Sequence, residues 1–298
     1  MAKKSRKPIP LVTTGGTAGP SSIGRVSSPA STGGAGTFFE QHVGAYWLAL
    51  LLVHGIPPIL HDCAVVEVHL QTEGLGWHTD DFLVIGQNGS GDRRKLVGQV
   101  KWSFTVSATD DEFKKAIQDF WKDFRDSQQF SLDTDRFALI TLRGTSTLLE
   151  HFSGLLDCSR AARDGVEFER RLATTGFLSA KAVKYCNEIR TIIGELEGKS
   201  VSTAELWPFL RVLHILSLDL NSATRQTEAA IKTLLAHTID EQDALGAAEA
   251  SWNALLRVVG EGMPQARSFR RDDLPQELQR RHSPVGGVAQ RPQGALSD

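Results

Sequence analysis

The sequence predicts an α/β fold in which a small mixed central sheet is flanked by helices and followed by a C-terminal helical extension. Between residues 37 and 142, helical patterns and short β-branched runs follow one another in the order α-β-β-β-α-β. From about residue 145 onward, most apolar residues recur with the period of a helix. Hydrophobic residues make up 41% of the chain and charged residues 23%, which is typical of a globular protein.

The first helix of this order is expected to be buried. Thr37 and Glu40 have the spacing of a capping box, in which two side chains bond each other's main-chain N–H groups at the start of a helix. Residues 43–54 then carry apolar side chains on nearly every side, and such a helix needs neighbours all round. Gly55 and Pro57 predict where it ends.

Three strands, a second helix and a fourth strand follow in the predicted order. Alternating and β-branched residues predict the first three strands, and the turn Asn88–Gly91 between the second and third is typical of a hairpin. The second helix is amphipathic, and the apolar run after it predicts a buried strand. In chain order, we expect these elements at residues 64–70, 80–85, 95–101, 110–125 and 137–142.

The rest of the chain is expected to be mostly helical. Helices are predicted near 145–172, 178–196, 224–237 and 240–260, and alternation at 213–220 allows a strand. Of the first 36 residues, 25 are Gly, Ser, Thr, Pro or Ala, which predicts a disordered segment. The expected organisation is a basic, Gly/Ser-rich arm at 1–35, a main domain at 36–222 with its core at 36–145, a helical extension at 223–275 and a linker-like tail at 276–298.

Charge and apolar patterning limit the possible partners. Residues 1–36 carry five Lys/Arg and no acid, which leaves 28 Lys/Arg against 35 Asp/Glu, a net charge of −7, in the remainder. A body of this sign is not a constitutive, charge-driven DNA binder. The longest apolar run, Ala45–Val53, has nine residues, whereas a bilayer span needs about 20. With no signal-peptide pattern and three scattered cysteines, we expect no membrane partner and a cytoplasmic location.

Polar residues on the second and third strands form the candidate site. Because side chains alternate along a strand, Gln99 and Lys101 lie on one face and Val100 points into the core. The hairpin brings Asp81 beside them. Asp81, the Gln99 side-chain oxygen and the Val100 carbonyl oxygen can supply part of the oxygen shell that Mg²⁺ prefers. Lys101 can orient an attacking water and balance negative charge on a phosphate.

Glu40 on the first helix could add a second carboxylate to this site, and each candidate also has a simpler interpretation. Glu40 could serve as the capping-box partner of Thr37 alone. Asp80 and Asp81 could be loop carboxylates at the start of a strand, and which of the two would bind a metal stays open. Gln99 and Lys101 could belong to a solvated strand face.

The order of these motifs resembles that of the PD-(D/E)XK, restriction-endonuclease-like superfamily. More narrowly, it resembles the double-stranded DNA endonuclease domain of bacterial antiphage effectors, found in cyclic-oligonucleotide (CBASS) effectors with a SAVED sensor and ahead of STAND-type ATPases. The resemblance covers roughly residues 36–145. The matching residues are Gly36-Thr-Phe-Phe-Glu40, Asp80-Asp-Phe-Leu-Val84, Gln99-Val-Lys101, Phe120-Trp-Lys-Asp-Phe124 and Asp135-Arg-Phe-Ala-Leu-Ile-Thr141.

The resemblance implies a restriction-endonuclease-like core and a role for each site residue. Asp81 and Gln99 would be metal ligands, Lys101 the catalytic lysine and Glu40 an accessory acid, with Mg²⁺ as the cofactor and Mn²⁺ as a substitute. Gln99 replaces the usual Asp or Glu of the superfamily. Its neutral amide removes one negative charge from the site, so we expect a lower metal affinity.

The predicted function is that of a Mg²⁺-dependent endonuclease effector of an antiphage system that cuts double-stranded DNA. Neither a SAVED-like sensor nor an ATP-binding motif is recognisable in the 298 residues. We therefore expect homo-oligomerisation driven by a sensor or STAND module, either fused or separate. The alternative is a restriction-like interaction module with weak or no activity that docks a partner through its helical extension. The choice between DNA and RNA as substrate stays open.

Overall fold

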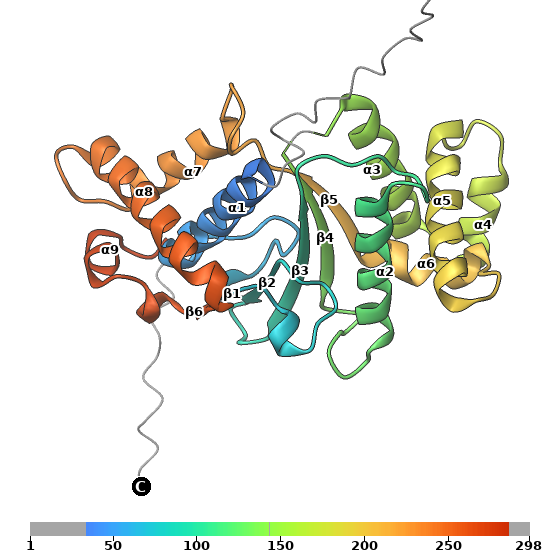
Figure 1. Ribbon diagram of the computed structural model, residues 1–298, viewed down its shortest axis with the longest axis horizontal. Coiled ribbons are helices and arrows are strands. Elements are labelled where there is room, and N and C mark those ends of the chain that lie inside the picture. The colour runs from blue at the N-terminus through green and yellow to red at the C-terminus, as the bar shows by residue number, and fades with distance from the viewer. Residues whose placement is uncertain (1–33, 143, 286–298) are drawn as a thin grey trace, which may run out of the picture.

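The computed structural model describes residues 34–142 and 144–285, which form a mixed six-stranded sheet with helices on both faces (Figure 1). The strand order is β5-β4-β3-β2-β1-β6. Neighbouring strands are antiparallel from β6 to β3, whereas β3, β4 and β5 are parallel. The strands are β1 (Ala64–Leu70), β2 (Phe82–Gln87), β3 (Arg93–Lys101), β4 (Arg136–Thr141), β5 (Leu213–Ser217) and β6 (Ser268–Phe269). The predicted α/β class is thereby confirmed.

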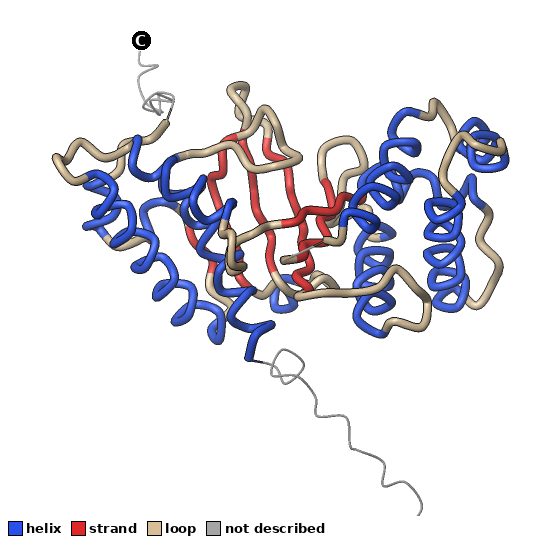
Figure 2. Tube along the Cα trace, turned by 90° about the horizontal axis from the view of Figure 1, so that it is seen from above, coloured by secondary structure: helices blue, strands red, loops and turns tan. Residues whose placement is uncertain are grey.

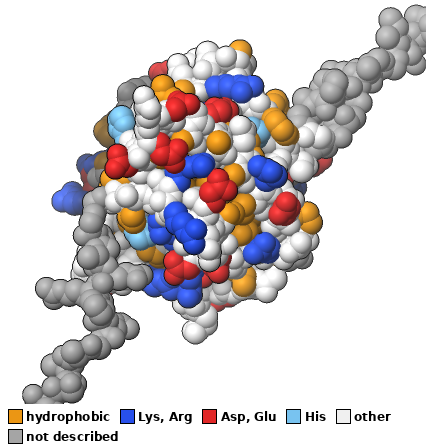
Figure 3. Space-filling view, turned by 90° about the vertical axis from the view of Figure 1, so that its left-hand side faces the viewer, with side chains coloured by type: hydrophobic (Ala, Val, Ile, Leu, Met, Phe, Trp, Pro, Cys, Tyr) orange, Lys and Arg blue, Asp and Glu red, His pale blue; other side chains and the backbone are white. Residues whose placement is uncertain are grey.

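The helices form two layers with the sheet between them, as the view from above shows (Figure 2). One layer contains α1 (Gly34–Val53), α7 (Gln226–His237), α8 (Ala244–Gly262) and α9 (Gln276–Arg281). The other contains α2 (Asp111–Arg125), α3 (Ser146–Ala161), α4 (Gly165–Ala173), α5 (Ala180–Glu197) and α6 (Thr203–Val212). Short 3₁₀ turns occupy Glu73–Leu75, Met263–Gln265 and Arg271–Asp273. On the side of the molecule over α7 to α9, acidic and basic side chains are interspersed (Figure 3).

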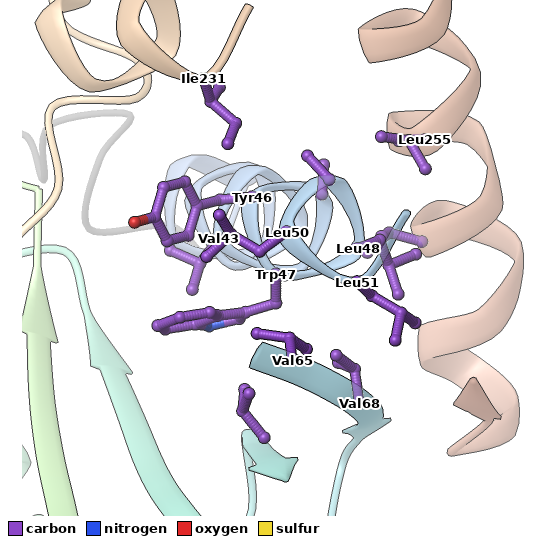
Figure 4. Close-up of a cluster of buried hydrophobic side chains, with 14 of the residues drawn as sticks. Val43, Tyr46, Trp47, Leu48, Leu50, Leu51, Val65, Val68, Ile231 and Leu255 are labelled. Carbon is purple, nitrogen blue, oxygen red and sulfur yellow. The ribbon is translucent and has the colours of Figure 1, made fainter. Parts of the chain in front are cut away.

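The first core layer forms around α1, which the sequence predicted to be buried. Trp47 lies over Val65 and Val68 of β1, while Leu48 and Leu51 point toward α8 (Figure 4). All of these side chains are fully buried. Because α7 and α8 cover the sides of α1 that the sheet leaves open, its apolar character all round is satisfied by packing. Within the described ranges, no helix combines the length and apolarity that a bilayer span requires.

The second core layer lies on the opposite face of the sheet. The amphipathic helix α2 connects β3 to β4, as parallel strands require. Its Phe113 and Phe120 are fully buried, and the Phe120 ring lies 5.0 Å from that of Phe137 on β4. Helices α3, α5 and α6 complete this layer.

Two predicted helix boundaries differ from those observed, and one helix was not predicted. Helix α1 begins at Gly34, so Thr37 lies inside the helix and the predicted capping box does not start it. The helix predicted near 145–172 is two helices, because Asp164 caps a new helix by accepting a hydrogen bond from the N–H of Glu167. Helix α6, which contains Pro208, was not predicted.

The linker-like tail predicted at 276–298 is wrong for its first part. Residues 276–281 form α9, and Leu278 is buried against the α1 layer. His282, 1% exposed, completes the attachment because its ring nitrogens contact the hydroxyls of Thr238 at 2.7 Å and Ser251 at 2.8 Å. The remainder of that tail, from 286, and most of the predicted arm, residues 1–33, lie outside the described residues.

A glycine on β3 makes the pairing with β2 possible. Gly98 pairs with Phe82, and a Cβ atom at Gly98 would lie 1.9 Å from the Phe82 ring. We expect Gly98→Ala to lower the free energy of unfolding by about 1–3 kcal/mol, because the buried ring has to move. Gly89 in the β2–β3 turn has open space around its Cβ position, so Gly89→Ala is the matched control. Urea unfolding measures both, and equal midpoints for the two variants would contradict this account.

Candidate active site

The predicted site lies where β2 begins and β3 ends, so the antiparallel pairing brings its residues together. The Gln99 side-chain Nε2 donates hydrogen bonds to Asp81 Oδ2 at 2.8 Å and to Asp80 Oδ1 at 2.9 Å. The main-chain N–H of Val100 also donates to Asp81 Oδ2. Gln99 is 2% exposed, and Val100 packs in the α1 core layer, as the alternation predicted. The sequence therefore placed Asp81 beside Gln99 correctly.

Lys101 lies on the same side of β3 as Gln99 and faces helix α2. Its Nζ lies 2.7 Å from Oε2 of Glu112, and the Lys101 side chain is 15% exposed. The charge of Lys101 also acts on Asp81 and Glu40, because it opposes the rise in pKa that burial causes in both carboxyl groups. The lysine is thus held between the candidate carboxylates and α2.

Asp80 forms the outer edge of the site. Its Oδ2 lies 3.3 Å from Lys115 Nζ, and Lys115 also pairs with Asp119 at 2.9 Å. Although burial opposes ionisation, hydrogen bonds from Gln99 and Lys115 hold the pKa of Asp80 below its ordinary value. Asp80 is therefore the ionised member of the Asp80–Asp81 pair at neutral pH.

Asp81 and Glu40 line one hollow together with Val100. Burial raises the pKa of Asp81 to about 8; the Val100 N–H opposes this rise, and the nearby charges of Glu40 and Asp80 add to it. Burial also raises the pKa of Glu40, and there Lys101 opposes the effect. Strongly shifted pKa values cluster at functional sites, so two such carboxyl groups in one hollow mark a candidate site.

The polar residues of this hollow and its neighbour Gln99 suit a hard cation in their donor chemistry. Asp81 and Glu40 offer carboxylates and Val100 a carbonyl oxygen, and Gln99, which contacts Asp81, offers an amide oxygen; all are ligand types that Mg²⁺ accepts. Gln99 Oε1 is buried and has no hydrogen-bond partner among the described residues. Rotating this amide by 180° would turn that oxygen toward Asp81. Over the same residues, no group of three or more His, Cys, Asp or Glu is arranged to hold a metal.

Sequence reasoning missed the residues that position the site. The buried carboxylate of Asp123 accepts hydrogen bonds from the N–H groups of His78 and Thr79, both at 2.8 Å, and so fixes the loop before Asp80 to α2. Glu112 reaches Lys101 because Asp110 caps α2 and places it in the first turn. The acidic run at 110–112 was a usable signal, whereas nothing local marks Asp123 as an anchor.

Comparisons with known proteins give structural likeness alone. No protein-family model matches this sequence, and no curated protein matches it. The Cap4 SAVED/CARF-domain containing receptor of Acinetobacter baumannii with the cyclic trinucleotide 3′3′3′-cAAA has 14% identity and a TM-score of 0.46, over 80% of this chain and 43% of the receptor. The corresponding receptor of Moraxella osloensis has 14% identity and a TM-score of 0.40, over 81% of this chain and 46% of the receptor.

This chain therefore spans less than half the length of those receptors. Identities and TM-scores at this level do not establish a shared activity. The assignment to the PD-(D/E)XK superfamily stays a prediction from the sequence motifs.

The raised pKa of Asp81 predicts a pH-dependent stability in metal-free buffer. An acid whose pKa is about 8 when folded and near its ordinary value of 3.8 when unfolded binds more protons in the folded state between these values. Its contribution to stability is therefore present at low pH and is lost as the pH rises through 8. Asp81→Asn mimics the protonated form, so this variant should gain stability relative to the wild type from pH 5 to pH 8.

Urea unfolding in the presence of EDTA at several pH values measures this difference. Asp133→Asn, at an exposed carboxylate on the α2–β4 connection, is the control and should follow the wild type. A parallel pH dependence of wild type and Asp81→Asn would show that Asp81 ionises normally.

Proposed function

We propose that this chain is a metal-dependent nuclease that hydrolyses phosphodiester bonds of double-stranded DNA. The observation that carries the proposal is the side-by-side arrangement of Asp81, Gln99 and Lys101 where β2 begins and β3 ends. An acid, an oxygen donor and an ammonium at one edge of a sheet provide for metal binding and for charge balance at a phosphate. The motif order resembling PD-(D/E)XK endonucleases supports the same reaction.

In this proposal, each residue has a defined task. A bound Mg²⁺, or Mn²⁺ in its place, would supply Lewis acidity and a more acidic water. Asp81 and Glu40 would supply the negative charge that binds the cation, and Val100 and Gln99 would be neutral oxygen donors. Lys101 orients the attacking water and offsets negative charge as the P–O3′ bond breaks. The products are a 5′-phosphate and a 3′-hydroxyl end.

We further propose that the nuclease serves bacterial antiphage defence and acts as an oligomer. The motif resemblance to antiphage effector domains supports the defence role. Outside residues 1–36 the chain carries a net charge of −7, which disfavours tight DNA binding by a single copy. Assembly by a sensor or STAND module would place two sites side by side for duplex cutting. Robust cutting by a dilute monomer would contradict this step.

One observation favours the second candidate, an interaction module with weak or no activity. The charged groups of the site are engaged with the protein itself, since Lys101 pairs with Glu112 and Asp80 pairs with Lys115. Such internal pairing could serve a structural role alone. Calorimetric titration with Mg²⁺ and Mn²⁺ separates the candidates, because the interaction module predicts no binding and the nuclease predicts saturable binding that Asp81→Asn abolishes.

Lys101 provides the direct test of the reaction. We expect Lys101→Ala to lower Mg²⁺-dependent cleavage of plasmid DNA by about a hundredfold or more, because removal of one charge-stabilising donor has an effect of this size. Lys181→Ala removes an exposed lysine at the start of α5 and should leave cleavage unchanged. Cleavage that persists in Lys101→Ala at the wild-type rate would exclude the proposed role.

Gln99 tests the metal site by a change of one charge. In Gln99→Glu, a carboxylate would face Asp80 and Asp81 in place of the donating amide, so the metal-free variant should be less stable than the wild type. Mg²⁺ should restore its melting temperature and should support activity at a lower concentration than in the wild type. Gln87→Glu at the far end of β2 is the control. Loss of metal binding in Gln99→Glu would contradict the proposed geometry.

A further inference from the structure

A group of arginine side chains and one histidine gathers at the opposite end of the sheet from the candidate active site. Arg94, Arg136 and His214 lie near the amino ends of β3, β4 and β5, which are parallel. The register pairs Leu96 with Arg136 and Ala138 with His214, so the three residues share one face of the sheet. Lys101 lies seven positions after Arg94 on β3, a distance of about 23 Å along an extended strand.

Two helices add further arginines at the edge formed by β5. Arg160 of α3 donates from Nη1 to the main-chain oxygen of Leu213 at 3.0 Å. The guanidinium of Arg211, at the end of α6, lies 4.7 Å over the Trp207 ring. Trp207 Nε1 in turn donates to the main-chain oxygen of Ser159 at 2.8 Å, next to Arg160. We call Arg94, Arg136, Arg160, Arg211 and His214 the arginine cluster.

Acids neutralise part of this cluster. Asp62 accepts hydrogen bonds from both terminal nitrogens of Arg94, at 2.7 and 2.8 Å. Asp157 forms an ion pair with Arg160 at 2.7 Å. Within the described part of the chain, Arg136 and Arg211 form no ion pair. The Arg136 guanidinium donates instead to neutral main-chain oxygens, including its neighbour's at 2.7 Å.

The cluster also holds polar atoms without partners. Arg94 Nε and His214 Nε2 are buried, and neither has a hydrogen-bond partner among the described residues. Burial, together with the charges of Arg160, Arg136 and His61, lowers the pKa of His214 to about 3. Burial also lowers the pKa of Arg136; Asp135 opposes this, whereas Arg94, Arg211 and Arg160 add to it. The guanidinium groups are thus close enough to repel one another.

We propose that the arginine cluster binds the phosphate groups of a compact, multiply charged ligand. The register and the contacts of Arg160 and Arg211 place these side chains near the amino ends of β4 and β5. Such a short stretch suits a small polyanion better than an extended acidic peptide. Planar guanidinium forks match phosphate oxygens in geometry, and each N–H can donate to a separate oxygen. A bound phosphate would offset the repulsion among the arginines and supply acceptors near Arg94 Nε and His214. The site is separate from the candidate active site and does not depend on nuclease activity.

Inorganic pyrophosphate is the first probe, titrated into the full chain by calorimetry in EDTA at constant ionic strength. We expect saturable binding that Arg211→Gln and Arg136→Gln each weaken by roughly tenfold or more. Arg257→Gln removes an exposed arginine of α8 and should leave the affinity within about twofold, as matched control. Lys101→Ala should also bind normally, which separates this site from the proposed active site.

A second measurement, with a short DNA duplex, identifies the source of the phosphate. If Arg211→Gln also weakens binding of a short DNA duplex, the site takes a nucleic-acid backbone; if DNA binding is unchanged, it takes a small phosphate ligand. Arg211 is exposed and touches the protein by stacking on Trp207, so its variant tests the site even if Arg136→Gln fails to fold. Absence of pyrophosphate binding, equal binding by all variants, or binding of a poly-glutamate peptide alone would overturn the proposal.

Discussion

The position of the candidate site depends on the pairing of β2 with β3, in which the Phe82 ring occupies the space beside Gly98. In this register, Asp81 lies next to Gln99 and the Val100 N–H reaches the Asp81 carboxylate. A shift by one residue would turn Gln99 and Lys101 to the opposite face of β3. The Phe82 ring also lies 5.4 Å from that of Trp47, so the same pairing connects the site to the buried helix α1 that carries Glu40.

Helix α2 supplies the side chains that hold the site residues of β2 and β3 in place. Asp123 fixes the loop that leads into Asp80, and Glu112 and Lys115 pair with Lys101 and Asp80. Each of these contacts crosses from the helix to a strand end, so the packing of α2 on the sheet determines the electrostatics of the site. An acidic pair held next to two lysines is balanced in charge without a ligand, and for this reason its chemistry has to be tested by metal binding as well as by cleavage.

Much of the fold and the central pair of the site could be predicted from local patterns. The strand at 64–70 and the helix ending at Arg125 match the observed elements because alternation and amphipathicity are properties of a few neighbouring residues. Asp81 beside Gln99 followed from one hairpin turn. The anchoring by Asp123, the helix around Pro208 and the docking of α9 could not be predicted in this way. Each depends on residues far apart in the sequence, as the contact of His282 with Ser251 illustrates.

Strand β3 connects two ends of the sheet with opposite electrostatic character. At its carboxyl end, Gln99 and Lys101 face carboxyl groups, and the buried Asp81 has a pKa of about 8 because no cation offsets its desolvation fully. At its amino end, Arg94 lies among arginines that lower the pKa of Arg136. At each end one ionisable group carries a cost of burial, since the pKa of Asp81 is raised and that of Arg136 is lowered. A cation beside Asp81 and an anion beside Arg136 would each offset this cost, which is the physical reason to test for a ligand of opposite charge at each end of β3.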